Sequence, residues 1–407
     1  MVFKNLYLLI LFILLGCSSS PESVVSSLPV IDIDKARDYP VKRIEIREVA
    51  DVEYIPLETT KKSLVATYVI QGYHVSDKYI VLFQDGRDIL LFDRSGKYLW
   101  TVNRRGGGPE EYHRISSLAV DFAAEEHYVF SYNNQKIFVY SFKGDFKRLL
   151  RLPSKRMYRF EYLFDYNDKY LIGYNADSFH EKRDQDLHPY YFIHKQSGQL
   201  VPVDSRLTMT DRGRRVFRRE IVTLPGIAYM DADSYILLPV LNNGSEFLIT
   251  DIGLDTLYNL ADDKLSPIAV RSPSVTMGEP QMNIGPILYT DSYLYFRLVS
   301  MKYDRATFRE VAEWEMPCFS LNRHTGEIVR PSIYDSNIIE SETRSIYLPS
   351  NMNQTFVESN YGMWTYSASN LIRWNENGGL RGELKEIASK LKEDDNNVTP
   401  YHLYKYK

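Results

Sequence analysis

The sequence predicts an all-β chain, folded as a six-bladed β-propeller that is closed by an N-terminal strand and followed by a short C-terminal helix. Three observations lead to this prediction. Strand-like runs, rich in Tyr, Phe and β-branched residues, recur between Gly, Asp, Asn and Ser. A hairpin unit repeats with a period near fifty residues, which is typical of four-stranded propeller blades. Helical periodicity is nearly absent before the C-terminus.

The repeated unit is an apolar strand, a polar turn that contains glycine, and a second strand. Consecutive turn glycines are separated by 48 to 73 residues. They are Gly96, Gly144, Gly198, Gly253, Gly326 and Gly378. A strand-like run precedes each unit, and innermost runs such as Ile115 to Asp121 come before these. Each unit therefore predicts strands c and d of one blade, whose strands a and b precede them.

The sixth unit, residues 371–380, stops after its first strand, so its blade lacks an outer strand. An unpaired sheet edge invites aggregation, and the N-terminal run Val52 to Glu58 is a spare strand. We expect this strand to complete the sixth blade and close the ring. Apolar residues after the sixth unit then recur at helical spacing, so a short helix and an extended tail should follow. These residues are Leu380, Leu384, Ile387 and Leu391.

The N-terminus has the features of a lipoprotein leader. Lys4 precedes an apolar run from Leu6 to Leu15, as in secretory signals, and the run is too short for the ~20 residues that span a membrane. The segment Leu14-Leu15-Gly16-Cys17 resembles the bacterial lipobox, which predicts cleavage before Cys17 and acylation of its thiol and amine. The alternative is an ordinary signal peptide with an accidental cysteine.

Three segments follow from these ends: a leader over 1–16, the lipidated cysteine with a flexible tether over 17–44, and the propeller with its helix and tail over 45–407. Ser and Pro dominate residues 18–29, as in flexible linkers. Several acyl chains give firm anchoring, so we expect a protein anchored by lipid in the bacterial cell envelope. Because residues 18–22 lack the acidic run that resembles a surface-export signal, the outer membrane, facing the periplasm, is the predicted place.

Composition restricts the partners and the redox chemistry. The chain has 49 basic and 53 acidic residues and a net charge of −4, which gives no general attraction to nucleic acid; no nucleic-acid partner is expected. Cys17 and Cys318 are the two cysteines, so lipidation of the first leaves no internal disulfide. Cys318 lies in a strand-like run and is expected to be an inert buried thiol rather than a nucleophile.

The segment from Gly106 to Asp121 resembles the linker of NHL-type propeller repeats. Its glycines are followed by an aromatic residue, Tyr112, and by a strand that ends in Val120-Asp121. With the stretches YIPLET and KEDDNN, it makes residues 45–407 similar to the six-bladed β-propeller lipoproteins of Bacteroidetes. This resemblance implies a fold and an envelope location, and no defined activity.

The stretch RRGGGPEEY, from Arg104 to Tyr112, has three glycines between basic and acidic pairs. It is either a phosphate-binding loop or a crossing between two blades. No Gly-Lys-Ser/Thr and no helix follow it, so we predict a crossing whose glycines adopt backbone angles that other residues disfavour. Residues that could also contact a ligand are Arg104, Arg105, Glu110 and Glu111.

The long insertions should all emerge on one face of the ring, which carries the b–c and d–a loops. They span residues 176–189, 204–224, 300–317 and 332–349. Loops on a rigid scaffold often carry function, so this is the predicted binding face. The loop DRGRRVFRRE supplies arginines that can contact carboxylate or phosphate in a bidentate manner, or else form a solvated charge run. These are Arg212, Arg214, Arg215, Arg218 and Arg219.

The loop HEKRDQDLH contains residue types that bind metals, at a spacing that matches no strong metal motif. They are His180, Glu181, Asp184, Asp186 and His188. No metal or cofactor is predicted, and no nucleophile elbow, zinc-protease helix or catalytic carboxylate pair is found. We therefore expect a binding or scaffolding lipoprotein whose partner is an acidic glycan or an envelope protein. The alternative is a carbohydrate lyase or hydrolase with its site at the channel mouth of the same face.

Overall fold

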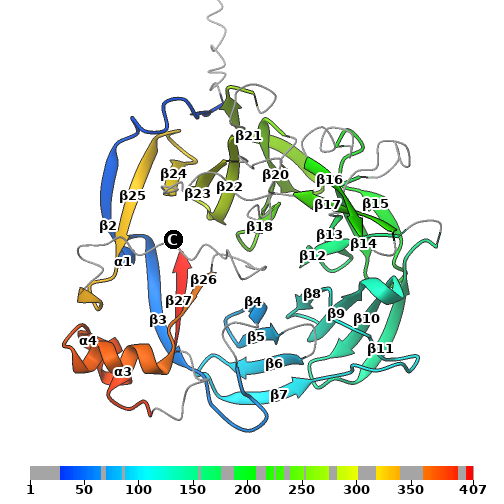
Figure 1. Cartoon of the computed structure of the whole chain (residues 1–407), viewed down its shortest axis with the longest axis horizontal. Coiled ribbons are helices and arrows are strands. Elements are labelled where there is room, and N and C mark those ends of the chain that lie inside the picture. Colours follow the sequence, from blue (N-terminus) through cyan, green and yellow to red (C-terminus); the bar gives the residue numbers. More distant parts are fainter. Residues whose placement is uncertain are drawn as a thin grey trace, which may run out of the picture.

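The structure, a computed structural model, describes thirteen ranges of the chain. They are residues 28–65, 70–84, 88–154, 157–175, 188–207, 217–223, 226–232, 239–251, 254–274, 282–300, 318–339, 361–392 and 400–406. Their sheets stand in a ring around a central axis, with α3 (Ala368–Glu376) and α4 (Gly382–Ala388) on the outside (Figure 1). A third short helix, α1 (Ile46–Val49), joins two N-terminal strands. The chain is an all-β propeller with a small helical part near its C-terminus. Within these ranges no helix has the length and apolarity that a membrane span requires.

Blades one to three are antiparallel four-stranded sheets, as the repeats predict. Blade one comprises β4 (Ile70–Val75), β5 (Tyr79–Gln84), β6 (Asp88–Asp93) and β7 (Tyr98–Val102). Blade two comprises β8 (Ser117–Asp121), β9 (Glu126–Ser131), β10 (Lys136–Ser141) and β11 (Phe146–Arg151), with the 3-10 turn η2 (Tyr132–Asn134) between its second and third strands. Blade three comprises β12 (Phe160–Asp165), β13 (Tyr170–Asn175), β14 (Tyr190–His194) and β15 (Leu200–Pro202).

Blades four and five each gain a fifth strand from the N-terminal segment. Blade four comprises β18 (Val240–Asn242), β19 (Phe247–Ile249), β20 (Thr256–Ala261) and β21 (Lys264–Ser272), with β1 (Val30–Asp32) parallel to β21. Blade five comprises β22 (Met282–Tyr289), β23 (Tyr293–Ser300), β24 (Cys318–Asn322) and β25 (Ile328–Tyr334), with β2 (Val41–Glu45) parallel to β25. The flexible tether predicted up to residue 44 is therefore wrong from β1 onward.

The fourth repeat has a different register from the predicted one. Its two strands pair as a hairpin, but they are β19 and β20, the second and third strands of blade four. The c–d turn of this blade is at Asp262 and Asp263, which both have a positive φ. Between blades three and four lies a two-stranded sheet of β16 (Phe217–Thr223) and β17 (Gly226–Ala232).

The predicted count of six blades is wrong, because the described chain forms five blades. Between the fifth and the first lies a three-stranded sheet in the order β26 (Tyr361–Thr365), β27 (Pro400–Tyr406), β3 (Ala50–Pro56) (Figure 1). Residues 371–380, predicted as its third strand, instead belong to helix α3 (Ala368–Glu376) and the turn after it. Ser367 caps this helix by accepting a hydrogen bond from the Asn370 amide, a start signal that favours helix.

The N-terminal strand β3 pairs antiparallel with the C-terminal strand β27, and together they close the ring. Two turn glycines show that β3 takes the place of an outer blade strand. A Cβ on Gly144 of blade two would lie 3.3 Å from the Val102 side chain at the end of β7. A Cβ on Gly96 of blade one would lie 2.1 Å from the carbonyl oxygen of Pro56 at the end of β3. Each turn packs on the outer strand of the preceding sheet. The strand β3 is therefore the outer strand on which the turn of blade one packs.

A buried carboxylate and the C-terminal helices stabilise the closing sheet. Asp335 is fully buried and accepts hydrogen bonds from Arg47 Nη1 at 3.0 Å and from the Tyr54 hydroxyl at 2.8 Å. Helix α4 (Gly382–Ala388), the predicted C-terminal helix, places Leu384 in one apolar cluster with Tyr54. The N-terminal segment is thus fixed to blade five and to the helices, although it lies almost 300 residues away in sequence.

One histidine lies in the apolar core between blades one and two. His127 on β9 is fully buried and stacks on Phe142, with ring centroids 4.8 Å apart. Neither ring nitrogen has a hydrogen-bond partner among the described residues. Burial, with a smaller effect of nearby His74, lowers the pKa of His127 to about 3. The imidazole therefore stays neutral at ordinary pH.

This burial predicts a loss of stability in mild acid. Between the unfolded pKa of 6.5 and the folded value of about 3, the unfolded chain binds the proton more readily, so the free energy of unfolding falls as the pH falls. The contribution is about 2 kcal/mol between pH 7 and pH 5. Urea unfolding at both pH values measures the difference in unfolding free energy between them, which should be smaller in His127→Leu than in the parent. The exposed His113, changed to Gln, is the control; an unchanged difference in His127→Leu would contradict the assignment.

Candidate functional site

Basic side chains bridge neighbouring sheets at one repeated position, the first residue after strand c. In blades one, three and five this residue is Arg94, Lys195 or Arg323, and its amide donates to a carbonyl just before strand b. Arg94 Nη2 lies 2.5 Å from Glu53 Oε2 on β3. Arg323 Nη2 lies 2.7 Å from Glu246 Oε2 on blade four. We call these contacts the inter-blade clamps.

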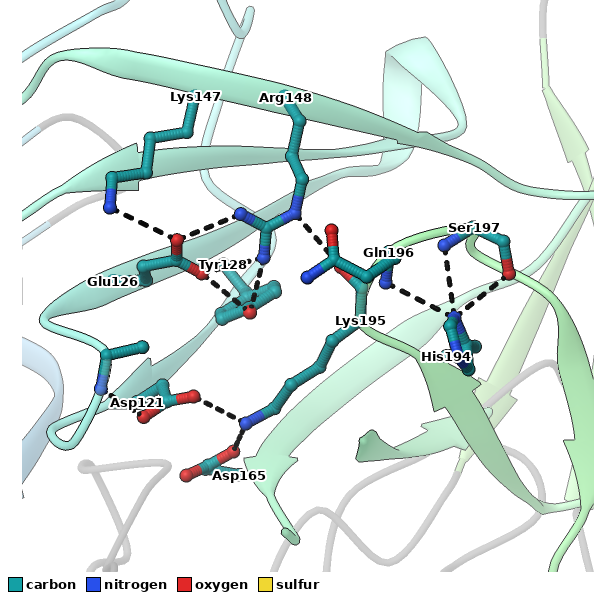
Figure 2. Close-up of polar contacts among 11 residues, drawn as sticks. Asp121, Glu126, Tyr128, Lys147, Arg148, Asp165, His194, Lys195, Gln196 and Ser197 are labelled. Carbon is teal, nitrogen blue, oxygen red and sulfur yellow. Dashed lines mark hydrogen bonds and ion pairs between the residues drawn. The ribbon is translucent and has the colours of Figure 1, made fainter. Parts of the chain in front are cut away.

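The clamp at Lys195 is the most deeply buried one (Figure 2). The Lys195 side chain is 3% exposed, and its Nζ lies 2.5 Å from Asp121 Oδ2 of blade two and 2.6 Å from Asp165 Oδ1 of blade three. Burial opposes the charge, but the two carboxylates outweigh it and raise the pKa of Lys195. A lysine that stays protonated is neither a nucleophile nor a general base.

A second ion pair continues the Lys195 clamp. Arg148 donates from Nη1 and Nη2 to the two oxygens of Glu126, at 2.9 and 2.7 Å, and from Nε to the Lys195 carbonyl at 3.1 Å. The Tyr128 hydroxyl also donates to Glu126, at 2.8 Å. Burial would raise the pKa of Glu126, yet these donors lower it to about 2. Figure 2 shows every charged group of the junction facing another, so the cluster stabilises the contact of blades two and three.

The nearby pair His194 and Ser197 forms a turn and not a catalytic dyad. Nδ1 of His194 lies 3.2 Å from the Ser197 amide and 3.1 Å from its hydroxyl. In blade one the same place is held by Asp93, which accepts from the Ser95 amide and hydroxyl at 2.9 and 2.6 Å. Because a carboxylate makes the same contacts in another blade, the imidazole here acts as a turn cap.

The RRGGGPEEY loop folds around its own residues. Tyr112 is fully buried, and its hydroxyl accepts from the Arg104 amide at 3.1 Å. Both Arg104 and Arg105 are exposed, and Arg104 Nε donates to the Gly144 carbonyl of blade two at 2.8 Å. The Gly108 amide, which a phosphate would need, donates to Glu111 at 2.8 Å. The loop is a crossing between blades, as the sequence predicts.

The reason for its glycines differs from the predicted one. None of Gly106, Gly107 and Gly108 has a positive φ, so backbone freedom is not what requires them. A Cβ on Gly106 would lie 1.9 Å from Glu111 Oε2, whereas one on Gly107 would meet nothing within 4 Å. Glycine at position 106 leaves room for the Glu111 carboxylate.

This geometry predicts unequal effects of two neighbouring substitutions. Gly106→Ala should displace the Glu111 carboxylate from the Gly108 amide and lower the free energy of unfolding by about 1 kcal/mol. The lost hydrogen bond to a charged group contributes about 1.5–3 kcal/mol. Alanine recovers part of this loss because it restricts the unfolded chain. Gly107→Ala, the control, should change it by less than about 0.5 kcal/mol. Urea unfolding measures both, and equal losses would contradict this role of Gly106.

Most of the other predicted site residues are not tested by the structure. Arg212, Arg214 and Arg215 lie outside the described residues, as do Cys17 and the loop residues His180, Glu181, Asp184 and Asp186. Arg218 and Arg219 lie on strand β16, not in a loop, opposite Asp231 and Met230 of β17. His188 Nδ1 lies 2.8 Å from the Leu207 carbonyl. Over the described ranges no group of three or more His, Cys, Asp or Glu residues could hold a metal ion.

Cys318 lies on β24 and behaves as an unreactive thiol. Its sulfur donates weakly to the Phe319 carbonyl at 3.6 Å. Burial, offset in part by Arg297, raises the pKa of this thiol to about 12. The nucleophilic thiolate is therefore not populated at neutral pH.

The clamps were missed in the sequence, although a weak signal for them exists. Arg94, Lys195 and Arg323 each stand two or three residues before the glycine of a c–d turn. Blade two has Phe142 at this position, so the pattern is incomplete. Nothing in the sequence identifies the carboxylates that these basic residues contact.

The fold and the clamps define a β-propeller whose buried charges join its blades. The chain belongs to a protein family described as "Domain of unknown function (DUF4934)", which matches residues 28–400. A comparison with curated proteins finds no match.

Two of the solved structures that resemble this chain come from Bacteroides. One is a protein described as exported, from Bacteroides fragilis, with 13% identity, a TM-score of 0.61, and coverage of 93% of this chain and 99% of the other. Another is a duf4221 family member from Bacteroides vulgatus, with 9% identity, a TM-score of 0.46, and coverage of 88% and 99%. At 13% identity the likeness to the Bacteroides fragilis protein concerns the fold alone.

Proposed function

We propose that the chain is a lipid-anchored binding or scaffolding protein of the bacterial cell envelope, without catalytic activity. One observation carries this proposal: the strand ends that the long connections join belong to the b–c and d–a side of the ring. The connections from a to b and from c to d in the five blades have at most five residues, whereas those after β13, β23 and β25 are much longer. A rigid ring with one elaborated face suits the recognition of a partner.

The chemistry of the described residues supports binding over catalysis. The Lys195 clamp, the His194 turn and the Cys318 thiol resemble reactive groups by residue type. Each has a structural role: a protonated lysine between carboxylates, a capped turn and a half-buried thiol of high pKa. The leader with its lipobox and the exported neighbour from Bacteroides fragilis support an envelope location.

Anchoring predicts a change of location on a single substitution. Cys17→Ser removes the acylation site, so the variant should move from the membrane fraction to the soluble fraction. Fractionation with a high-salt wash, followed by immunoblotting, measures this. Membrane association equal to that of the parent would contradict lipid anchoring. Proteolysis of intact cells tests the position, and protection of the domain is the result expected for a periplasm-facing protein.

Binding and catalysis are separated by one screen on the purified full chain. The chain is incubated with an array of neutral and acidic glycans, and bound glycan and released fragments are measured together. Binding without new reducing ends or unsaturated products is the expected result. Turnover of any glycan would replace this proposal with a carbohydrate lyase or hydrolase.

A further inference from the structure

Two basic residues stand directly opposite each other at one end of blade two. Lys136 begins β10, Arg151 ends β11, and the two are partners in the antiparallel ladder. Like charges at directly opposed positions destabilise a sheet. Neither side chain is within ion-pair distance of a carboxylate of the described chain. This pair weakens the fold, so folding alone does not account for it.

Two exposed side chains, one aromatic and one apolar, stand on the connections that adjoin this basic pair in the chain. The turn η2 that leads into β10 carries Tyr132, which is 38% exposed. Gln135 joins this turn to the loop that enters blade three: its side-chain oxygen accepts from the Tyr158 amide at 2.7 Å, and its side-chain nitrogen donates to the Tyr158 carbonyl at 3.0 Å. That loop carries Met157, which is 54% exposed.

Blade three packs on the backbone of Arg151, and the loop that enters blade three carries a third cation, Arg159. A Cβ on Gly198 of blade three would lie 2.9 Å from the Arg151 carbonyl oxygen, so that turn packs closely on the backbone of Arg151. Arg159 Nη2 lies 2.6 Å from Glu161 Oε1; the arginine side chain is 46% exposed and the glutamate side chain 34%. Exposed ion pairs are worth little, so a ligand carboxylate can replace Glu161. We call Tyr132, Lys136, Arg151, Met157 and Arg159 the blade-two platform.

We propose that the blade-two platform binds an acidic polysaccharide. Directly opposed strand residues are about 5 Å apart, comparable to the length of one sugar ring, so Lys136 and Arg151 can contact the carboxylate of one sugar or of neighbouring sugars. Arginine suits a carboxylate by its two parallel donors. Tyr132 and Met157 can cover the apolar face of the ring and remove it from water. This inference rests on the proposed function, for which it names the ligand class and a site.

The test measures binding of fluorescent oligogalacturonate to the full chain, purified in mild detergent, by anisotropy. The double variant K136Q/R151Q should weaken binding about tenfold or more, since each tenfold step needs only a modest loss of contact energy. Its melting temperature should not fall, because the substitution removes a repulsion. K78Q/K97Q removes the same charge from two exposed lysines of blade one and is the matched control, with an expected change below about twofold. Affinity of the parent should fall as salt screens the contacts.

Each other outcome overturns the inference. Equal weakening in K78Q/K97Q would show that net charge alone matters. Three results would exclude an acidic polysaccharide as the ligand. They are equal affinity of the parent for a neutral glucan, tighter binding to vesicles of anionic phospholipid, and no binding of oligogalacturonate. If the chain binds another glycan or a protein, and K136Q/R151Q binds it with the affinity of the parent, the platform is overturned but the proposed function is kept. Turnover of a glycan would overturn the proposed function itself.

Discussion

Removal of residues 400–407 is expected to unfold the whole propeller and not only its C-terminus. The strand β27 is the middle strand of the closing sheet, pairing with β26 over five positions and with β3 over seven. Without it, β3 has no partner in this sheet, and the turn of blade one that packs on Pro56 loses its support. We expect the melting temperature to fall by about 10 °C or more, since each 1 kcal/mol shifts a large domain by about 2–4 °C.

Thermal unfolding followed by circular dichroism and by tryptophan fluorescence measures this loss. Removal of Lys407 alone is the control and should have no effect, because β27 ends at Tyr406. His402→Pro is a second variant of the same strand: proline breaks the ladder of a central strand, so it should act in the same direction as the truncation. A truncated chain that melts at the temperature of the parent would show that the ring closes without β27.

Lys195→Met is expected to cost about 3–5 kcal/mol of unfolding free energy, because removal of one partner leaves buried charges uncompensated. Asp121 and Asp165 would face each other without their common cation, and their side chains are only 9% and 26% exposed. Methionine has a similar length, so packing changes little. Urea unfolding at pH 7 measures the loss, which should shrink when Asp121→Asn is added.

Arg206→Met is the matched control for this prediction. Arg206 Nη2 lies 2.5 Å from Asp204 Oδ2, the same separation as at the Lys195 clamp, but the arginine side chain is 79% exposed. Exposed pairs contribute little to stability, so this variant should unfold almost as the parent does. Similar losses in the two variants would mean that burial does not give the Lys195 clamp its strength.

The regular part of the fold could be predicted because its signals are local. The glycines at 96, 144, 198 and 326 all have a positive φ in c–d turns, and turn residues of this kind are readable from the sequence. The prediction of a strand in the sixth repeat failed because Gly378 follows a helix. Leu371 and Trp374 are three residues apart and face α4 and Tyr366. A glycine after an apolar run ends helices as readily as it turns hairpins.

The long-range contacts could not be predicted from one sequence. Lys195 and Asp121 are 74 residues apart, and Glu246 and Arg323 are 77 apart. No local pattern joins such partners, because the ring brings them together. The short parallel strands β1 and β2 were missed for the same reason: each depends on the outer strand of a distant blade. The opposed Lys136 and Arg151 likewise became visible only through the register of β10 and β11.

Hydrogen–deuterium exchange of the full chain, with and without oligogalacturonate, tests the central claim that the chain binds a ligand on the side of its b–c and d–a connections. The predicted result is slower exchange in residues 132–136 and 151–159, with no change in the c–d turns around Gly96 and Gly326. Protection confined to those turns, or no protection in the presence of saturating ligand, would contradict the claim.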